Sequence, residues 1–142
     1  MSHTNPDSDT LFGILDRAQT IAVVGASSNP ERPSHGIFQR LLRQGYTVIP
    51  INPGEKEVLG QRAYATLAEV PVPIDIVDVF RRAVDTPPIA EAAVSVGAKV
   101  LWLQSGISSD EAAQIAQAGG LTVIMDACIA VELSLLNVPA KK

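Results

Sequence analysis

Short apolar runs alternate with amphipathic segments along most of the chain. The runs have the length of single strands, are rich in Val, Ile and Leu, and lie at Thr20–Ala26, Thr47–Asn52, Ile74–Phe80, Lys99–Gln104 and Leu121–Met125. Apolar runs with so few polar residues are typical of parallel strands that are buried on both faces of a sheet. The pattern therefore predicts five such strands.

The segments between the runs carry helix signals. A stripe that starts at Leu11 has helical spacing, and it predicts a short amphipathic helix beginning near Thr10. Ile37 and Leu41 belong to a second stripe, which ends before Gly45, a residue suited to a left-handed C-cap. Three further helix starts are indicated by capping residues at Thr66–Glu69, Thr86–Pro87 and Ser108–Glu111.

Strands that alternate with helices are joined by right-handed crossovers into a parallel sheet. We therefore predict an α/β fold, a doubly wound five-stranded parallel sheet with helices on both faces. The preferred strand order is 3-2-1-4-5, and the alternative is the flavodoxin-like order 2-1-3-4-5. We expect one domain over residues 11–138, a flexible tail at 1–10 and a second tail at 139–142.

Composition narrows the class of protein. With 142 residues, 46% of them hydrophobic and 18% charged, the chain has the size and apolar content of one folded domain. The net charge is -4 and no basic block is present, which argues against a nucleic-acid partner. The apolar runs are too short to cross a membrane, the first ten residues lack the apolar core of a signal peptide, and the single cysteine suits a reducing compartment. We expect a cytoplasmic protein.

The loop after the first strand has the residues of a phosphate-binding site. Gly25 allows a close backbone approach, and Ser27, Ser28 and Asn29 offer hydrogen-bond donors. Arg32 adds a fixed positive charge just before a predicted helix start, where free N–H groups attract anions. Ligands of doubly wound sheets bind at this edge, so we expect an anionic ligand here.

Other chemistries fit the sequence less well. The loop lacks the G-x-G-x-x-G spacing, and the second strand ends in Asn52-Pro53 instead of an acidic residue, which argues against NAD. The Walker lysine and the acidic cluster of a receiver domain are also missing, so Asp75 and Asp78 are interpreted as polar contacts near strand ends. Two histidines and one cysteine, widely separated, predict no metal site, and we assign no catalytic residue.

Several motifs resemble one family, in order along the chain. They are Val23-Val24-Gly25-Ala26-Ser27, Asn29-Pro30-Glu31-Arg32-Pro33-Ser34, Gly45-Tyr46-Thr47-Val48-Ile49-Pro50-Ile51-Asn52-Pro53, Val58-Leu59-Gly60, Pro73-Ile74-Asp75-Ile76-Val77-Asp78-Val79-Phe80-Arg81-Arg82, Val100-Leu101-Trp102-Leu103-Gln104-Ser105-Gly106 and Met125-Asp126-Ala127-Cys128. They look like those of the small stand-alone CoA-binding proteins, which are similar to the CoA-binding domain of the succinyl-CoA synthetase alpha subunit. The resemblance implies a Rossmann-like fold.

The resemblance also implies where CoA or an acyl-CoA binds. In the synthetase, CoA touches the loop after strand 1, a lysine after strand 2 and the end of strand 4. The lysine position falls at about Glu55, so its neighbour Lys56 is the candidate here. The other two segments correspond to Gly25, Ala26, Ser27, Ser28, Asn29 and Pro30, and to Leu103, Gln104 and Ser105.

The charges agree with a polyanionic ligand. Arg32, Lys56, Arg81 and Arg82 all fall in loops that follow predicted strands, and Phe80 is a candidate to flank the adenine or pantetheine. Asn52 and Pro53 complete the candidate site, and Cys128 is a candidate contact for the ligand's thiol. We expect a carrier, sensor or regulatory module without its own catalysis and with a protein partner as a further option. The alternative is a small NAD(P)- or acyl-CoA-dependent enzyme.

Overall fold

Five parallel strands form the centre of the molecule in this computed structural model, which describes residues 3–141. They are β1 (Thr20–Val24), β2 (Thr47–Ile51), β5 (Ile76–Val79), β6 (Val100–Leu103) and β7 (Thr122–Ile124). Each strand lies inside one of the predicted apolar runs. Apart from the first residues of β1, β2 and β7, every strand residue is buried, as expected for a sheet covered on both faces.

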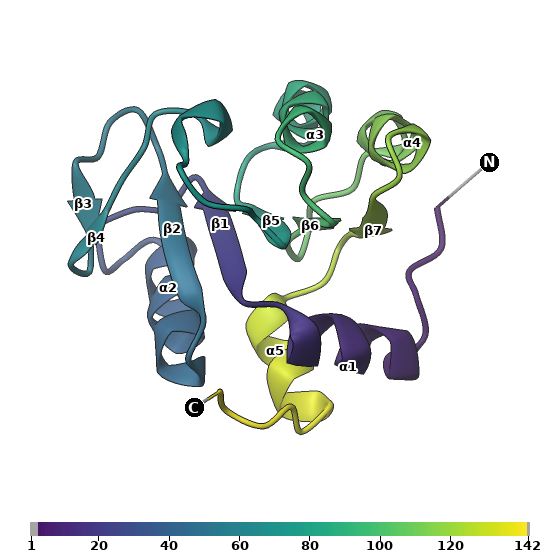
Figure 1. Cartoon of the computed structure of the whole chain (residues 1–142), viewed down its shortest axis with the longest axis horizontal. Helices are drawn as coiled ribbons and strands as arrows, with labels where there is room; N and C mark the ends of the chain where they lie inside the picture. Colours follow the sequence, from purple (N-terminus) through teal and green to yellow (C-terminus); the bar gives the residue numbers. More distant parts are fainter. Residues whose placement is uncertain (1–2, 142) are drawn as a thin grey trace.

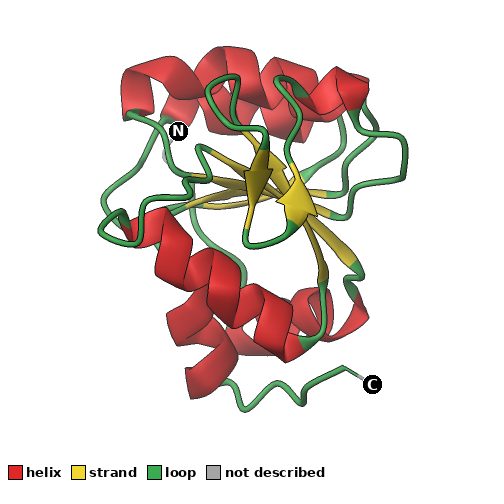
Figure 2. Cartoon of the chain, turned by 90° about the vertical axis from the view of Figure 1, so that its left-hand side faces the viewer, coloured by secondary structure: helices red, strands yellow, loops and turns green. Residues whose placement is uncertain are grey.

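Helices cover both faces of the sheet, as predicted. Helices α3 (Thr86–Ser95) and α4 (Asp110–Ala118) pack on one face, and α1 (Ser8–Arg17), α2 (Pro33–Gln44) and α5 (Ile129–Leu135) pack on the other (Figures 1 and 2). Each face has its own buried apolar cluster, because successive strand side chains point to opposite sides. The doubly wound, Rossmann-like α/β fold is therefore confirmed.

The order of the sheet is β2-β1-β5-β6-β7. After β2 the chain forms a small hairpin of β3 (Glu57–Val58) and β4 (Gln61–Arg62), and Tyr64 then makes a single parallel bridge to Ile51 on the outer side of β2. If this bridge is counted as a rudimentary third strand, the arrangement is of the 3-2-1-4-5 type. The five complete strands alone read 2-1-3-4-5, the alternative order. The outer strand stays rudimentary because the chain turns into the 3-10 helix η1 (Leu67–Glu69) directly afterwards.

Local capping explains where the helices begin and end. Asp7 accepts a hydrogen bond from the Thr10 backbone at 2.9 Å, so α1 starts at Ser8, two residues earlier than expected. Gly45 ends α2 with φ of 103°, which is the left-handed cap that the sequence predicts. Ser109 caps α4 through the backbone N–H of Ala112 at 3.1 Å. The cap therefore lies one residue after the predicted Ser108.

The two ends of the described chain contact the domain. The side-chain amide of Asn5 exchanges two hydrogen bonds with the backbone of Met125, at 2.8 and 2.9 Å. Near the other end, the N–H of Lys141 donates to the carbonyl of Gln44 at 2.7 Å. Thr86 begins α3 itself, directly after the 3-10 helix η2 (Ala83–Asp85).

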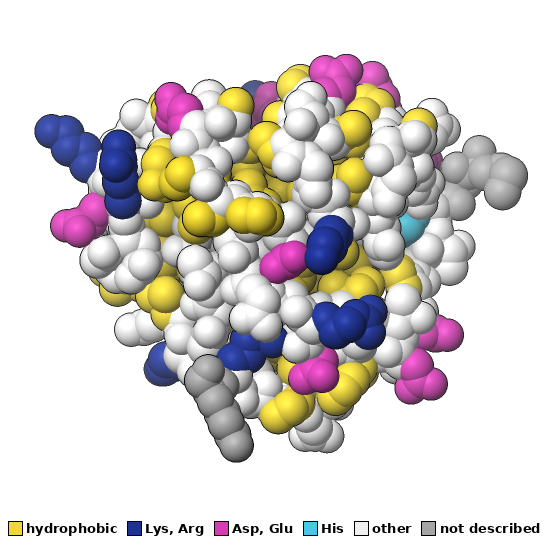
Figure 3. Space-filling model, viewed as in Figure 1, with side chains coloured by type: hydrophobic (Ala, Val, Ile, Leu, Met, Phe, Trp, Pro, Cys, Tyr) yellow, Lys and Arg dark blue, Asp and Glu magenta, His cyan; other side chains and the backbone are white. Residues whose placement is uncertain are grey.

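The surface carries charges of both signs side by side. On the face that Figure 3 shows, lysine and arginine side chains are interspersed with acidic ones, and hydrophobic atoms lie between them. Within residues 3–141, no helix has the length and apolar content that a membrane crossing requires.

Candidate functional site

A cleft of about 500 Å³ lies at the carboxyl ends of the parallel strands. Loops after all five strands contribute to its lining, which is the position expected for a ligand site in a doubly wound sheet. The predicted site residues that line the cleft are Gly25, Ser27, Arg32, Asn52, Phe80, Arg81, Arg82, Gln104, Ser105 and Cys128. The lining residues that the sequence analysis missed are Pro33, Ser34, Ile37 and Ile107.

The missed residues had a partial signal in the sequence. Pro33 and Ser34 continue the phosphate-loop motif, and Ile37 lies one helical turn farther on in α2. Ile37 belongs to the predicted apolar stripe of α2: it is half-buried, packs against the apolar cluster on that face of the sheet, and also lines the cleft. No pattern in the sequence singled out Ile107.

Other predicted site residues do not line the cleft. Ala26 and Leu103 are fully buried, because their side chains belong to the two apolar clusters on either side of the sheet. The remainder have exposed positions on the outer parts of the loops; they are Ser28, Asn29, Pro30, Pro53 and Lys56.

Gly25 allows three strand ends to meet below the cleft. Its φ is +89°, and a Cβ at this position would lie 2.5 Å from the carbonyl oxygen of Phe80. The backbone N–H of Gly25 donates to the carbonyl of Ile51 at 2.9 Å, and the backbone N–H of Phe80 donates to the carbonyl of Val24 at 2.8 Å. The close approach therefore joins the ends of β1, β2 and β5 directly, and a side chain at position 25 would push them apart.

Polar contacts within the loop after β1 hold its shape. The hydroxyl of Ser27 accepts from the N–H of Asn29 at 3.1 Å, and the Asn29 side chain accepts from the N–H of Glu31 at 3.0 Å. At the other end, the ring Nδ1 of His35 lies 3.1 Å from the carbonyl oxygen of Ser27. His35 thus supports the loop from α2 and is absent from the cleft lining.

The loop after β2 is joined to the loop after β1. The amide of Asn52 donates to the carbonyl of Ala26 at 2.9 Å and accepts from the N–H of Gly54 at 2.9 Å. The Glu55 carboxylate accepts from the backbone N–H of Ser28 at 2.8 Å and from its hydroxyl at 2.9 Å. The two loops therefore form one connected wall beside the cleft.

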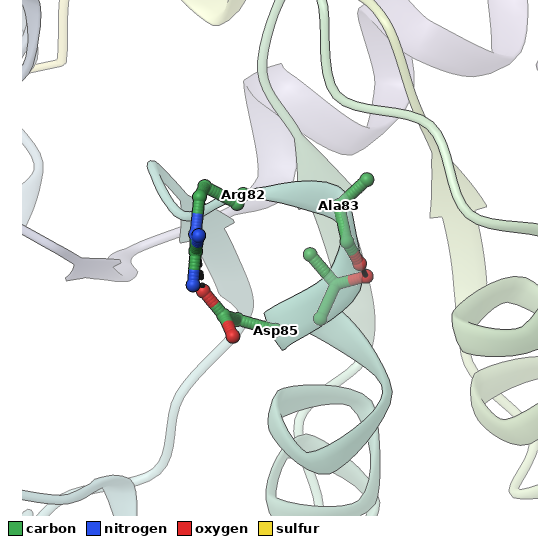
Figure 4. A network of polar contacts seen from close by, with 4 residues as sticks. Arg82, Ala83 and Asp85 are labelled. Atoms are coloured by element: carbon green, nitrogen blue, oxygen red, sulfur yellow. Dashed lines mark hydrogen bonds and ion pairs between the residues drawn. The ribbon is translucent and has the colours of Figure 1, made fainter.

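The cleft lining is cationic. Arg32, Arg81 and Arg82 lie in it, and none of its lining residues within 3–141 is acidic. At the rim, the Arg82 guanidinium pairs with Asp85 at 3.2 Å, and both side chains are well exposed (Figure 4). Exposed pairs of this kind contribute little free energy, so redirecting Arg82 toward an anion in the cleft costs little.

Gln104 fixes the floor of the cleft at the start of α5. The side chain is 3% exposed, and its oxygen accepts from the backbone N–H of Ile129 at 3.1 Å. Cys128, the residue before Ile129, is the N-cap of α5 and carries a free, half-buried thiol. The predicted position of Cys128, after the fifth strand and before the last helix, is confirmed.

Asp75 and Asp78 have different environments, although both were expected at strand ends. Asp75 precedes β5 and accepts from the backbone of Gln19 and Thr20 at 2.8 and 3.0 Å, with Lys99 at 3.5 Å. Partial burial acts to raise the pKa of Asp75, but these hydrogen bonds and the lysine outweigh it and lower the pKa below its usual value.

Asp78 is the third of the four residues of β5 and makes no polar contact within residues 3–141, so its interpretation as a polar contact near the strand end was wrong. Its Cα neighbours across the sheet are Val23 and Trp102, its side chain is fully buried, and neither carboxylate oxygen has a hydrogen-bond partner within residues 3–141. Burial raises the pKa of Asp78 well above its usual value. The raised pKa favours the neutral form of the Asp78 carboxyl, because an unpaired buried charge is strongly disfavoured.

Potential metal ligands are scattered. The described residues contain no group of three or more His, Cys, Asp or Glu side chains that could hold a metal ion. The chemistry that the cleft offers is thus hydrogen bonding from hydroxyls and amides, three guanidinium groups and one thiol.

A protein family, a bacterial relative and a solved structure each match most of this chain. The family described as CoA binding domain matches residues 19–134. The uncharacterized protein YneT of Bacillus subtilis (strain 168) is 44% identical over 127 residues, which cover 89% of this chain and 94% of that protein. A solved structure, a hypothetical protein from Pyrococcus horikoshii OT3, superposes with a TM-score of 0.91 at 35% identity, over 96% of this chain and 99% of the other.

A larger enzyme subunit contains a similar segment. The alpha subunit of acetate–CoA ligase (ADP-forming) II of Pyrococcus furiosus is 40% identical over 57 residues, which are 39% of this chain. The matched segment is only 12% of that subunit, so most of the ligase subunit has no counterpart in the match.

Proposed function

Because the chain belongs to the family of CoA-binding domains, we propose that it binds coenzyme A or an acyl-CoA in the cleft at the carboxyl ends of its strands. The observation that carries the proposal is the concentration of Arg32, Arg81 and Arg82 in one cleft of a chain whose net charge is -4. A local group of guanidinium groups attracts and orients phosphate groups even when the whole molecule is negative.

The ligand would extend across the cleft from phosphates to thiol. Arg32 and Ser27 on one side, with Arg81 on another, suit the phosphates, and the Phe80 ring offers an apolar surface for the adenine or pantetheine. Gln104 and Ser105 would supply hydrogen bonds farther along. The role that follows is that of a carrier, sensor or regulatory module for CoA without catalysis of its own.

Cys128 is our candidate contact for the thiol end of the ligand. It is the single cysteine of the chain, and it lines the cleft. With oxidised CoA as the co-reactant, the Cys128 thiolate would attack one sulfur of the CoA disulfide, forming a protein–CoA disulfide and releasing one CoA thiolate. Intact-mass measurement should show one CoA adduct, lost on reduction and absent from Cys128→Ser. An unmodified protein would remove Cys128 from the ligand-contacting set.

Titration calorimetry tests the proposed binding. We expect saturable binding of one CoA per chain, and NAD binding that is weaker by about tenfold or more, because the second strand ends in Asn52, whose side chain is already bonded to Ala26 and Gly54. Absence of saturable CoA binding would overturn the proposal. NAD binding as tight as CoA binding would instead favour a dinucleotide-dependent enzyme.

A further inference from the structure

Glu55 places a carboxylate on the loop beside the cationic cleft, although neither Glu55 nor its partner Ser28 is among the lining residues. It accepts two hydrogen bonds from Ser28, from the backbone N–H at 2.8 Å and from the hydroxyl at 2.9 Å. Ser28 directly follows Ser27, which lines the cleft. The donors that the phosphate-type loop offers at position 28 are therefore already occupied by an anion that belongs to the protein.

The backbone of Glu55 is held in this place by the end of β2. Its N–H donates to the carbonyl of Asn52 at 3.2 Å, and the Asn52 amide in turn donates to Ala26 at 2.9 Å. The Glu55 side chain is half-buried. These hydrogen bonds fix the Glu55 carboxylate in the wall formed by the loops after β1 and β2. Its negative charge therefore acts on a ligand that binds next to this wall.

The position of the wall indicates which part of a nucleotide meets this charge. In doubly wound sheets the diphosphate lies over the loop after the first strand and the following helix start, and the ribose lies beside the carboxyl end of the second strand. Arg32 is the N-cap residue of α2, where this arrangement puts the diphosphate, whereas Asn52 and Glu55 follow the end of β2, where it puts the ribose. A phosphate monoester on that ribose would face the Glu55 carboxylate.

We propose that Glu55 is a specificity-determining residue that disfavours a phosphate monoester on the ribose of the bound nucleotide. The inference rests on the proposed function, because it concerns a ligand of the same cleft. CoA remains the proposed ligand, and Glu55 lowers its affinity through the phosphate monoester on the ribose. CoA and dephospho-CoA make the test direct, since they differ only in this phosphate.

The experiment is calorimetric titration of wild-type protein, Glu55→Gln and Glu57→Gln with CoA and with dephospho-CoA. Glu55→Gln removes the charge and keeps a hydrogen-bond acceptor for Ser28. We expect its affinity for CoA to rise by about three- to tenfold and its affinity for dephospho-CoA to change less than about twofold. The gain for CoA should shrink at about 0.5 M salt, because the repulsion is then screened.

Glu57→Gln is the matched control, because it removes the same charge two residues away on the exposed start of β3. Its affinities for both ligands should equal those of wild type. Equal gains or equal losses for both ligands in Glu55→Gln would overturn the inference and leave the proposed function standing, since Glu55 would then act only on loop shape. Wild-type protein that binds neither ligand would overturn the proposed function and this inference with it.

Discussion

Arg32 is both the residue that begins α2 and a positive charge in the lining of the cleft. It is the N-cap residue of α2 in extended conformation, it makes no side-chain capping hydrogen bond, and its side chain lines the cleft. A guanidinium carries only hydrogen-bond donors, so it cannot cap the free N–H groups at the start of α2, and its donors remain available for a ligand phosphate.

We expect Arg32→Ala to weaken CoA binding by about 1–3 kcal/mol, because a charge-assisted contact to phosphate is lost. Calorimetry of the variant measures the loss directly. Arg43→Ala is the control. Arg43 is exposed in the last turn of α2, so this substitution removes an equal charge far from the cleft. Unchanged CoA affinity in Arg32→Ala would exclude Arg32 from the binding site.

At the scale of elements, the cleft depends on how closely the loops after β1 and β5 approach each other. The positive φ of Gly25 and the 2.5 Å separation between its hypothetical Cβ and the Phe80 carbonyl oxygen leave no room for a side chain. The contact is between backbones, so no side-chain rotation can relieve it. The strand ends would have to separate instead.

Gly25→Ala should therefore lower the free energy of unfolding by about 2–4 kcal/mol, from the left-handed conformation and the backbone clash together. Chemical denaturation monitored by circular dichroism measures this change. Gly36→Ala provides the contrast, because Gly36 lies within α2 and nothing occupies the space where its Cβ would be. That variant should gain about 0.5–1 kcal/mol. Similar stabilities for the two variants would contradict the close-approach argument.

At the scale of the whole molecule, the buried carboxyl of Asp78 links stability to pH. Its pKa is raised in the folded protein, so the folded state keeps a proton that the unfolded state releases above about 3.8. The free energy of unfolding should then fall as the pH rises from about 4 toward the folded pKa. Asp75 acts in the opposite direction, since its lowered pKa adds stability above the unfolded pKa that is lost as the pH falls through the folded pKa.

Asp78→Asn should remove the fall in the free energy of unfolding that is linked to deprotonation of Asp78. Relative to wild type, the variant should gain stability between pH 4 and pH 8 by about 1 kcal/mol or more, because the asparagine has no proton to lose. Urea denaturation at a series of pH values measures the difference. Asp75→Asn is the comparison, and it should lose stability at neutral pH. A constant difference between Asp78→Asn and wild type across this range would show that Asp78 is not the linked group.

The local pattern of residues determined the secondary structure and much of the cleft. All five strands of the parallel sheet lie inside the predicted apolar runs, and Gly45 caps α2 as expected, because these features depend on residues a few positions apart. Gly25, Ser27 and Arg32 could be found because ligand sites in this fold lie after the first strand.

Only the tertiary structure decided the contacts between distant segments. The sequence analysis interpreted Asp78 as a polar contact near a strand end, whereas the register with Val23 and Trp102 buries it in the middle of the sheet. Lys56 was the expected cation after β2, yet it lies outside the cleft lining, and its neighbour Glu55 bonds to Ser28 instead. Periodicity and capping are properties of neighbouring residues, whereas partner choice across loops depends on sheet order and register, which only the folded chain determines.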